Sequence, residues 1–155
     1  MVDRAPAAVT GLRANTADVL GTWGLDRDGD QSFAVLLVLT ELVTNASRHG
    51  RPHLGLIDTE MWLDNDHVVV TVRDSTTNVP MIRDAGSGDE SGRGLGLIST
   101  YAVASGYEPH HGGKLVWAVI GPHPAPEEGP FVVSLPPTAD TLRGLETTRD
   151  RESRR

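Results

Sequence analysis

The amino-acid sequence predicts a domain of the α/β (α+β) class, because helical and strand-like stretches follow one another along one chain. Two helical segments come first, residues 10–23 and a second segment that runs to His49. Two strand-like runs follow, residues 54–63 and 67–73, joined by the polar turn Asp64-Asn65-Asp66, which is typical of a hairpin. A further helix and one or two more strands complete the order, so the helices have a sheet to pack against.

The first helix is predicted from its apolar spacing. Leu12, Val19 and Trp23 recur at helical intervals, and Gly24 follows as a stop. Residues 1–9 contain Ala and Pro with little periodicity, and we interpret them as an N-terminal lead-in.

The second helix follows a polar turn and carries a polar row near its end. We expect Asp28 or Asp30 to cap its start. Toward its end, Glu41, Asn45 and Arg48 point within about 60° of one another, with His49 at the edge of that sector. The apolar residues that point elsewhere, and can pack on a sheet, are Val35, Leu36, Leu39, Leu42, Val43 and Ala46. A carboxylate beside an amide oxygen suits a hydrated divalent cation and its anion, which predicts a metal–nucleotide site.

Two other metal patterns are disfavoured. The turn at residues 26–30 resembles a calcium loop, but Gly29 comes too early and the distal Glu is missing. His49 and His53 are four residues apart, as zinc ligands on a helix would be, but a glycine and a proline break the helix between them.

The hairpin and the glycine-rich segment after it supply two more candidate features. We expect Val68, Val70 and Val72 to face the core. Asp74, at the end of this strand, is either a turn-capping residue or a hydrogen-bond acceptor for a ligand. Farther along, the glycine-rich stretch Gly92-Arg-Gly94-Leu-Gly96 leads into a third helix, which we expect to begin at Gly94 and to run to about Ser105 with Gly106 as its stop.

A glycine-rich approach to a helix start offers free backbone N–H groups to phosphate. It follows no strand and contains no Gly-Lys-Ser/Thr, which disfavours a Rossmann turn and a P-loop. The last predicted strands are residues 114–120 and, after a Pro-rich loop, 131–135, and the polar tail 136–155 is expected to be disordered.

Composition limits the function. The chain has 155 residues, one domain by the usual size, and no apolar run that approaches a membrane span. It has no cysteine and no signal peptide, so cytoplasm is the expected location. A net charge of −7 disfavours direct binding to nucleic acid.

A helix face with Glu-x-x-x-Asn, an aspartate at a strand end and a glycine-rich helix start come here in one order. In that order they resemble the GHKL ATPase family, shared by histidine kinases, DNA gyrase, a class of heat-shock chaperones and mismatch-repair ATPases. Glu41 to Gly50 looks like its N box, Asp74 to Pro80 like the first glycine box in its Asp-x-Ser form, and Gly92 to Gly96 like the second. The closest likeness is to the stand-alone anti-sigma factor type of serine kinase, because Glu-Leu-Val-Thr-Asn-Ala and the Gly112-Gly113-Lys114 approach to a strand look typical of it.

The resemblance covers about residues 10–121 and implies the fold. That fold is a two-layer α/β sandwich, with a mixed, mostly antiparallel sheet packed on one side by about three helices. Residues 81–93 would form a flexible ATP lid inside a single domain of residues 10–135.

Carried over residue by residue, the resemblance also implies roles at the site. Asn45 would ligate the Mg²⁺ that joins the ATP phosphates, Glu41 would act as general base, and Asp74 would accept the adenine amino group. The second glycine box, with Gly92, Gly94, Leu95 and Gly96, would let the backbone approach the phosphates, and Arg93 is a candidate for screening their charge. Arg48 and His49 either line the phosphate side or only complement the negative end of the helix.

Two departures from the family pattern stand out. Leu115 occupies a position where Thr is common, and a lost hydroxyl there would weaken nucleotide affinity. The first glycine box contains no glycine at residues 75–78, as is common in this subtype.

Two functions from different classes follow. The first is a serine/threonine protein kinase that phosphorylates a small STAS-type anti-sigma factor antagonist and also sequesters an RNA polymerase sigma factor. The second is a binding module in which ATP is a structural clamp without phosphotransfer. A third interpretation, a buried polar network with no ligand, is disfavoured by three motifs in family order. The amphipathic first helix is compatible with homodimerisation.

Overall fold

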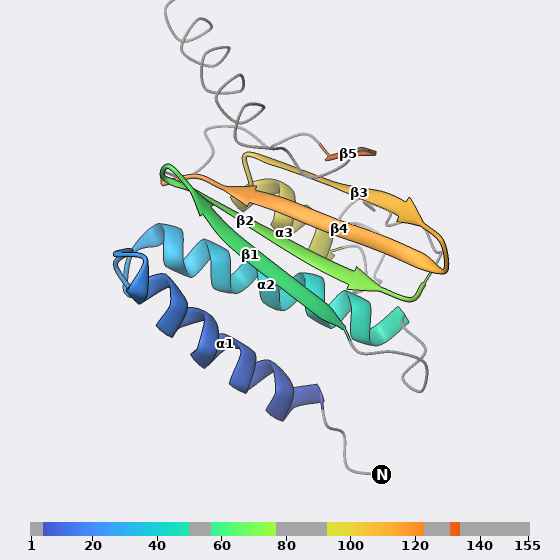
Figure 1. Cartoon of the computed structure of the whole chain (residues 1–155), viewed down its shortest axis with the longest axis horizontal. Coiled ribbons are helices and arrows are strands. Elements are labelled where there is room, and N and C mark those ends of the chain that lie inside the picture. The colour runs from blue at the N-terminus through green and yellow to red at the C-terminus, as the bar shows by residue number, and fades with distance from the viewer. Residues whose placement is uncertain (1–4, 50–56, 77–92, 123–130, 134–155) are drawn as a thin grey trace, which may run out of the picture.

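The structure, a computed structural model, describes residues 5–49, 57–76, 93–122 and 131–133. In these residues, three helices lie on one side of a five-stranded sheet (Figure 1). The elements are α1 (Ala5–Thr22), α2 (Asp30–His49), β1 (Asp58–Asp64), β2 (His67–Asp74), α3 (Arg93–Tyr101), β3 (Ala104–His110), β4 (Gly113–Ile120) and β5 (Phe131–Val133). This arrangement confirms the predicted α/β sandwich.

The sheet has the strand order β1-β2-β4-β3-β5. β1 and β2 form the predicted hairpin, whose turn places Asn65 in the left-handed region at φ 53°. β3 and β4 form a second antiparallel hairpin, and β4 also pairs with β2 in antiparallel register. β5 joins β3 in parallel, so the sheet is mixed but mostly antiparallel. β4 therefore lies between β2 and β3, and the connection from β2 to β3 runs through α3.

The main core lies between the sheet and the helices. Val68, Val70 and Val72 of β2 are at most 1% exposed and face this core, as their alternation predicts. The α2 residues that meet them are Val35, Val38, Leu39, Leu42 and Ala46. Each valine or leucine among them contributes about 1.5–3 kcal/mol when fully buried. The predicted apolar side of α2 therefore packs on the sheet, except that Val38 belongs to the core in place of Leu36.

The opposite face of the sheet is buried as well. Val69, Trp117 and Val119 are at most 2% exposed and form a second apolar cluster with Ala104. The central strands therefore bury side chains on both faces, which an alternating hairpin pattern does not predict.

Backbone contacts explain where α1 ends. Gly24 takes φ +83°, the amide of Leu25 donates to the Leu20 carbonyl at 3.1 Å, and Gly24 donates to Gly21 at 3.1 Å. This pair of bonds is a Schellman motif, and it confirms the predicted glycine stop. The helix begins at Ala5, earlier than the expected Thr10.

Asp26 organises the turn that leads into α2. Oδ1 of Asp26 accepts from the Asp28 amide at 3.0 Å, and the Asp26 carbonyl accepts from the Gly29 amide at 3.1 Å and from the Ser32 hydroxyl at 2.6 Å. These bonds form a side-chain turn ahead of Asp30, where α2 begins. That Asp28 or Asp30 caps the helix stays a prediction.

The prediction for the third helix was wrong beyond Tyr101. We expected helix to about Ser105, but α3 ends at Tyr101 and β3 begins at Ala104. The amide of Val103 donates to the Val119 carbonyl at 2.8 Å, so pairing with β4 takes over from helical bonding there. Ala, Ser and Gly at the start of β3 have weak strand propensity, and the sheet overrides it.

None of the helices in the part of the chain that the structure describes is long and apolar enough to cross a membrane.

Candidate nucleotide site

The candidate site is organised around Asp74, the last residue of β2. Asp74 pairs with Lys114 of β4 in antiparallel register, so both side chains lie on one face of the sheet. Val72 and Val116 are two residues away on the same strands, so they share this face, and both belong to the core beneath the helices. The face therefore points toward the helices. Asp74 and Lys114 are each 7% exposed. The structure therefore confirms that a carboxylate ends a central strand on the helical side.

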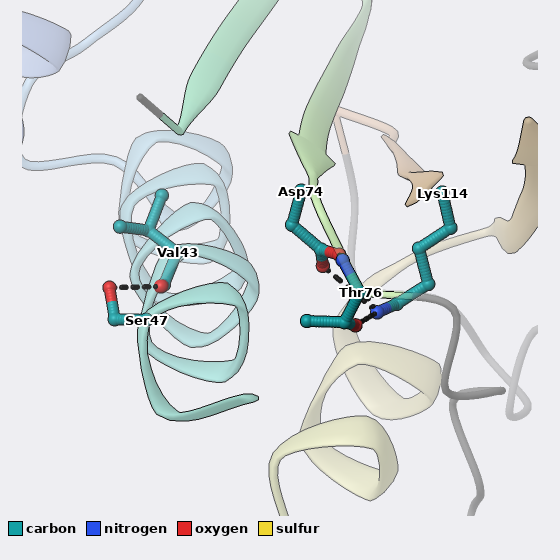
Figure 2. Close-up of polar contacts among 5 residues, drawn as sticks. All are labelled: Val43, Ser47, Asp74, Thr76 and Lys114. Atoms are coloured by element: carbon teal, nitrogen blue, oxygen red, sulfur yellow. Dashed lines mark hydrogen bonds and ion pairs between the residues drawn. The ribbon is translucent and has the colours of Figure 1, made fainter. Parts of the chain in front are cut away.

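Three polar groups converge at this strand end (Figure 2). Lys114 Nζ lies 3.0 Å from Asp74 Oδ1 and 3.0 Å from Oδ2. The Thr76 amide donates to Asp74 Oδ1 at 2.8 Å, and Lys114 Nζ also donates to the Thr76 hydroxyl. We call Asp74, Thr76 and Lys114 the acceptor cluster. Thr76 is itself 7% exposed, so the whole cluster is buried.

Gly113 makes the cluster sterically feasible. A Cβ atom at Gly113 would lie 2.0 Å from the Asp74 carbonyl oxygen and 3.1 Å from Ser75 Cα. Only glycine fits where the backbones of β2 and β4 approach this closely. Gly112 before it takes φ +80° in the turn from β3 to β4. The two glycines therefore bring Lys114 alongside Asp74.

The ammonium of Lys114 lies against the buried carboxylate of Asp74 and compensates its charge. An isolated buried carboxylate loses much of its solvation, and a paired ammonium restores part of that loss. A carboxylate has about four acceptor positions, and the bonds in the acceptor cluster use three of them. Within the acceptor cluster, one acceptor position of Asp74 Oδ2 is not used. Such a position can accept a hydrogen bond from the amino group of a ligand.

The polar row of α2 lies on the helix that packs against β2 and β4. Glu41 and Asn45 are both half-buried and lie one turn apart in the second half of α2. Figure 1 shows that the last turns of α2 and the end of β2 lie at the same end of the molecule. Arg48 is exposed, and His49 is the last residue of α2, with its side chain outside the described part of the structure.

The glycine-rich segment is described from Arg93 onward. Arg93 begins α3, and Gly94 and Leu95 follow in its first turn, but the side chains of these residues are not described. Gly92 and the rest of the predicted lid, residues 81–92, lie outside the described residues. A Cβ atom at Gly96 would meet no heavy atom within 4 Å, so there is open space beside the first turn of α3.

At its other end, α3 is anchored to α2. The ring of Tyr101 packs edge-on against Phe33 in the first turn of α2, with ring centroids 6.0 Å apart. Ile98 on α3 is 1% exposed in the main core. The glycine-rich turn is therefore at the end of α3 away from this aromatic contact.

The register of β4 corrects our interpretation of Leu115. Leu115 pairs with Arg73, so its side chain lies on the face of the sheet opposite Asp74. A threonine hydroxyl at this position would not point toward the Asp74 carboxylate. The neighbour of that carboxylate on β4 is Lys114 instead.

Sequence reasoning missed the roles of Thr76 and Lys114. Both residues belong to the segments that carried the family resemblance, but neither had an assigned function. Their meeting depends on the register between β2 and β4, which are 40 residues apart at Asp74 and Lys114. A lysine flanked by glycine and an apolar strand was the available signal, because charged residues rarely enter a buried strand without a partner.

One comparison with known proteins identifies the family. A family model described as a histidine kinase-like ATPase domain matches residues 2–120, which contain the polar row of α2, the acceptor cluster and the start of α3. No curated protein and no solved structure matches the chain. The chain therefore belongs to the histidine kinase-like ATPase domain family and is an ATP-binding protein.

Proposed function

We propose that this protein is an anti-sigma factor with serine/threonine kinase activity toward a small STAS-type antagonist. The observation that carries the proposal is the placement of Glu41 and Asn45, half-buried and one turn apart, on the helix that packs against the strand ending in Asp74. A carboxylate and an amide in this arrangement supply the two groups that phosphoryl transfer needs, a proton acceptor and a metal ligand.

The nucleotide would be held at both of its ends. Asp74 accepts the adenine amino group through Oδ2, and the first turn of α3 with Gly94 and Gly96 meets the phosphates. Asn45 would hold Mg²⁺, whose charge offsets that of the phosphate oxygens. Arg48, His49 and Arg93 are cationic candidates for the phosphate side.

The proposed reaction transfers the γ-phosphoryl group of ATP to a hydroxyl of the antagonist. The hydroxyl oxygen forms a bond to the γ-phosphorus, and the bond from that phosphorus to the β,γ-bridging oxygen breaks, which releases ADP. The hydroxyl proton passes to the carboxylate of Glu41, which later loses it to water. The antagonist then carries a phosphate that repels acidic surfaces, so phosphorylation can decide which partner the kinase holds.

Labelling in native lysate tests this function. The wild-type protein is incubated in lysate with ATP labelled at the γ-phosphate, beside Glu41→Gln and the control Glu60→Gln, an exposed glutamate of β1. We expect acid-stable phosphoserine or phosphothreonine on a small antagonist with the wild type and the control, and its loss with Glu41→Gln.

Co-purification from the same lysate identifies the regulatory class. Recovery of a sigma factor on the immobilised protein, dependent on ATP, would support the anti-sigma role. Acid-labile phosphohistidine as the Glu41-dependent product would instead overturn the serine/threonine assignment. ATP binding with no Glu41-dependent label on any protein would favour the clamp function.

A further inference from the structure

We propose that Ser99 and Ser105 form the binding site of one ordered internal water molecule between α3 and the sheet. The inference is independent of the proposed function, because neither serine belongs to the candidate nucleotide site. It rests on two buried hydroxyl groups that have no protein partner, on the short side chains around them and on one carbonyl group at the end of α3.

The two hydroxyl groups are the first observation. Ser99 is 4% exposed and Ser105 is 0% exposed, and in the part of the chain that the structure describes neither Oγ atom has a hydrogen-bond partner. A buried hydroxyl without a partner loses its hydration and gains nothing in return, so native proteins rarely leave one. Ser32 shows the usual arrangement, since it is also buried and its hydroxyl donates to the Asp26 carbonyl at 2.6 Å. Ser99 and Ser105 therefore need another partner.

The strand register places Ser105 on the helical side of the sheet. Ser105 alternates with Tyr107, which belongs to the core beneath the helices, so both side chains are on that face. Ser99 is on α3 beside Ile98, whose side chain belongs to the same core. α3 contacts β3, and only residues 102 and 103 join them, so β3 returns alongside the last turns of α3. The two hydroxyl groups therefore lie in the layer between α3 and β3.

The side chains around the two serines are short. Ala118 of β4 is the direct neighbour of Ser105, and Ala102 follows the end of α3. Both alanines are 0% exposed. Short side chains where a helix packs on a sheet leave space that a small polar molecule can fill, and a buried water requires both this space and polar partners.

A third polar group comes from the end of α3. In a continued helix, the amide of Val103 would donate to the carbonyl of Ser99. The Val103 amide instead donates to the Val119 carbonyl of β4 at 2.8 Å, whereas the Ala102 amide still donates to the Ile98 carbonyl at 2.8 Å. The Ser99 carbonyl therefore loses its helical donor where the chain leaves the helix for the sheet.

One water molecule satisfies all three groups. It can donate to the Ser99 carbonyl and to one serine hydroxyl, and it can accept from the other hydroxyl. Three hydrogen bonds are the usual number for a buried water. The water links the end of α3 to β3, and it therefore helps to position the helix whose first turn carries the glycine-rich segment.

Alanine substitutions give opposite results for a bound water and for hydroxyl groups that are only unpaired. If a water is bound, Ser99→Ala and Ser105→Ala each remove one of its partners, and the equilibrium constant for unfolding should rise about five- to tenfold. If the hydroxyl groups are unpaired, the same substitutions remove a desolvated polar group, and this constant should fall. Ser47→Ala, at an exposed position of α2, is the control for the gain in helix propensity that alanine brings to Ser99→Ala.

The double variant tests whether the two serines share one water. With both serines replaced by alanine, the loss of stability should be smaller than the sum of the two single losses, because a shared water can be lost only once. Urea titration of the wild type, the two single variants, the double variant and the control measures these losses. A crystal structure of the wild-type protein shows the water directly.

Destabilisation of both single variants after correction by the control, a smaller than additive loss in the double variant, and electron density for a water within hydrogen-bond distance of both Oγ atoms support the inference. A stabilised or unchanged single variant, additive losses in the double variant, or no density at this place overturns it.

Discussion

Gly113 lies so close to Asp74 that a single added methyl group would reach within 2.0 Å of the Asp74 carbonyl oxygen. This approach occurs where β4 begins and β2 ends, and the next residue of β4 is the lysine that pairs with the aspartate. A backbone constraint in one strand therefore sets the position of a charge in its neighbour. The geometry of the acceptor cluster depends on glycine as much as on its polar members.

Gly113→Ala should accordingly destabilise the fold and weaken nucleotide binding together. The added Cβ pushes β4 away from β2, because the atom that it meets is backbone and cannot rotate aside. We expect a loss of about 1–3 kcal/mol in the free energy of unfolding, measured by urea titration. Gly11→Ala is the matched control, since a Cβ there meets nothing within 4 Å, and it should be neutral or slightly stabilising. Equal stability of the two variants would contradict the steric role of Gly113.

The charges of the acceptor cluster should be strongly coupled in folding. Lys114→Met leaves a buried carboxylate without its cation and should lower the free energy of unfolding at neutral pH by about 3–5 kcal/mol. Asp74→Asn combined with Lys114→Met removes both charges, and this double variant should be more stable than Lys114→Met alone. Urea unfolding of the two single variants and the double variant measures the coupling. Additive losses would show that the pair is energetically independent.

Glu41→Gln should separate binding from chemistry. The amide has nearly the shape of the carboxylate but cannot take the hydroxyl proton, so phosphotransfer should slow by about 100- to 10,000-fold. ATP affinity should stay close to that of the wild type, because Asp74 and the start of α3 hold the nucleotide. Phosphotransfer rate and calorimetric affinity are measured on one preparation, with Glu60→Gln as the control. A variant that phosphorylates at the native rate would remove Glu41 from the base role.

Asn45→Ala should abolish the dependence of ATP binding on Mg²⁺. The side-chain oxygen that the proposal gives to the cation is lost, while the apolar side of α2 is untouched. We expect ATP titrations with Mg²⁺ and with excess chelator to become equal in this variant. Asn15→Ala, an exposed asparagine of α1, should keep the wild-type difference between the two titrations. Retention of that difference by Asn45→Ala would place the cation elsewhere.

Local patterns predicted the elements that have strong periodicity. The apolar side of α2, the glycine stop at Gly24 and the hairpin of β1 and β2 are confirmed because each depends on residues close in sequence. β3 was missed because its first residues, Ala, Ser and Gly, have little strand character of their own. They become a strand because β4 offers an unpaired edge beside them.

The candidate site was predictable in its parts but not in its pairing. Asp74 was found from its place at the end of a strand, since the strand itself was recognisable. Its contact with Lys114 depends on the register between strands that are not consecutive, and no local pattern encodes that register. The close approach at Gly113 is likewise visible only when β2 and β4 lie side by side. Whether Glu41, Asn45 and Asp74 bind one nucleotide remains a prediction.

The central claim is that the carboxylate of Asp74 recognises adenine by accepting a hydrogen bond from its amino group. Calorimetric titration of Asp74→Asn with ATP and GTP in the presence of Mg²⁺ tests this claim most directly. Asp58→Asn, which changes an exposed aspartate at the start of β1, serves as the control. We expect the wild type and the control to bind ATP in strong preference to GTP, and we expect this preference to be at least about tenfold weaker in Asp74→Asn. An unchanged preference in a folded Asp74→Asn protein would show that Asp74 does not bind the adenine base.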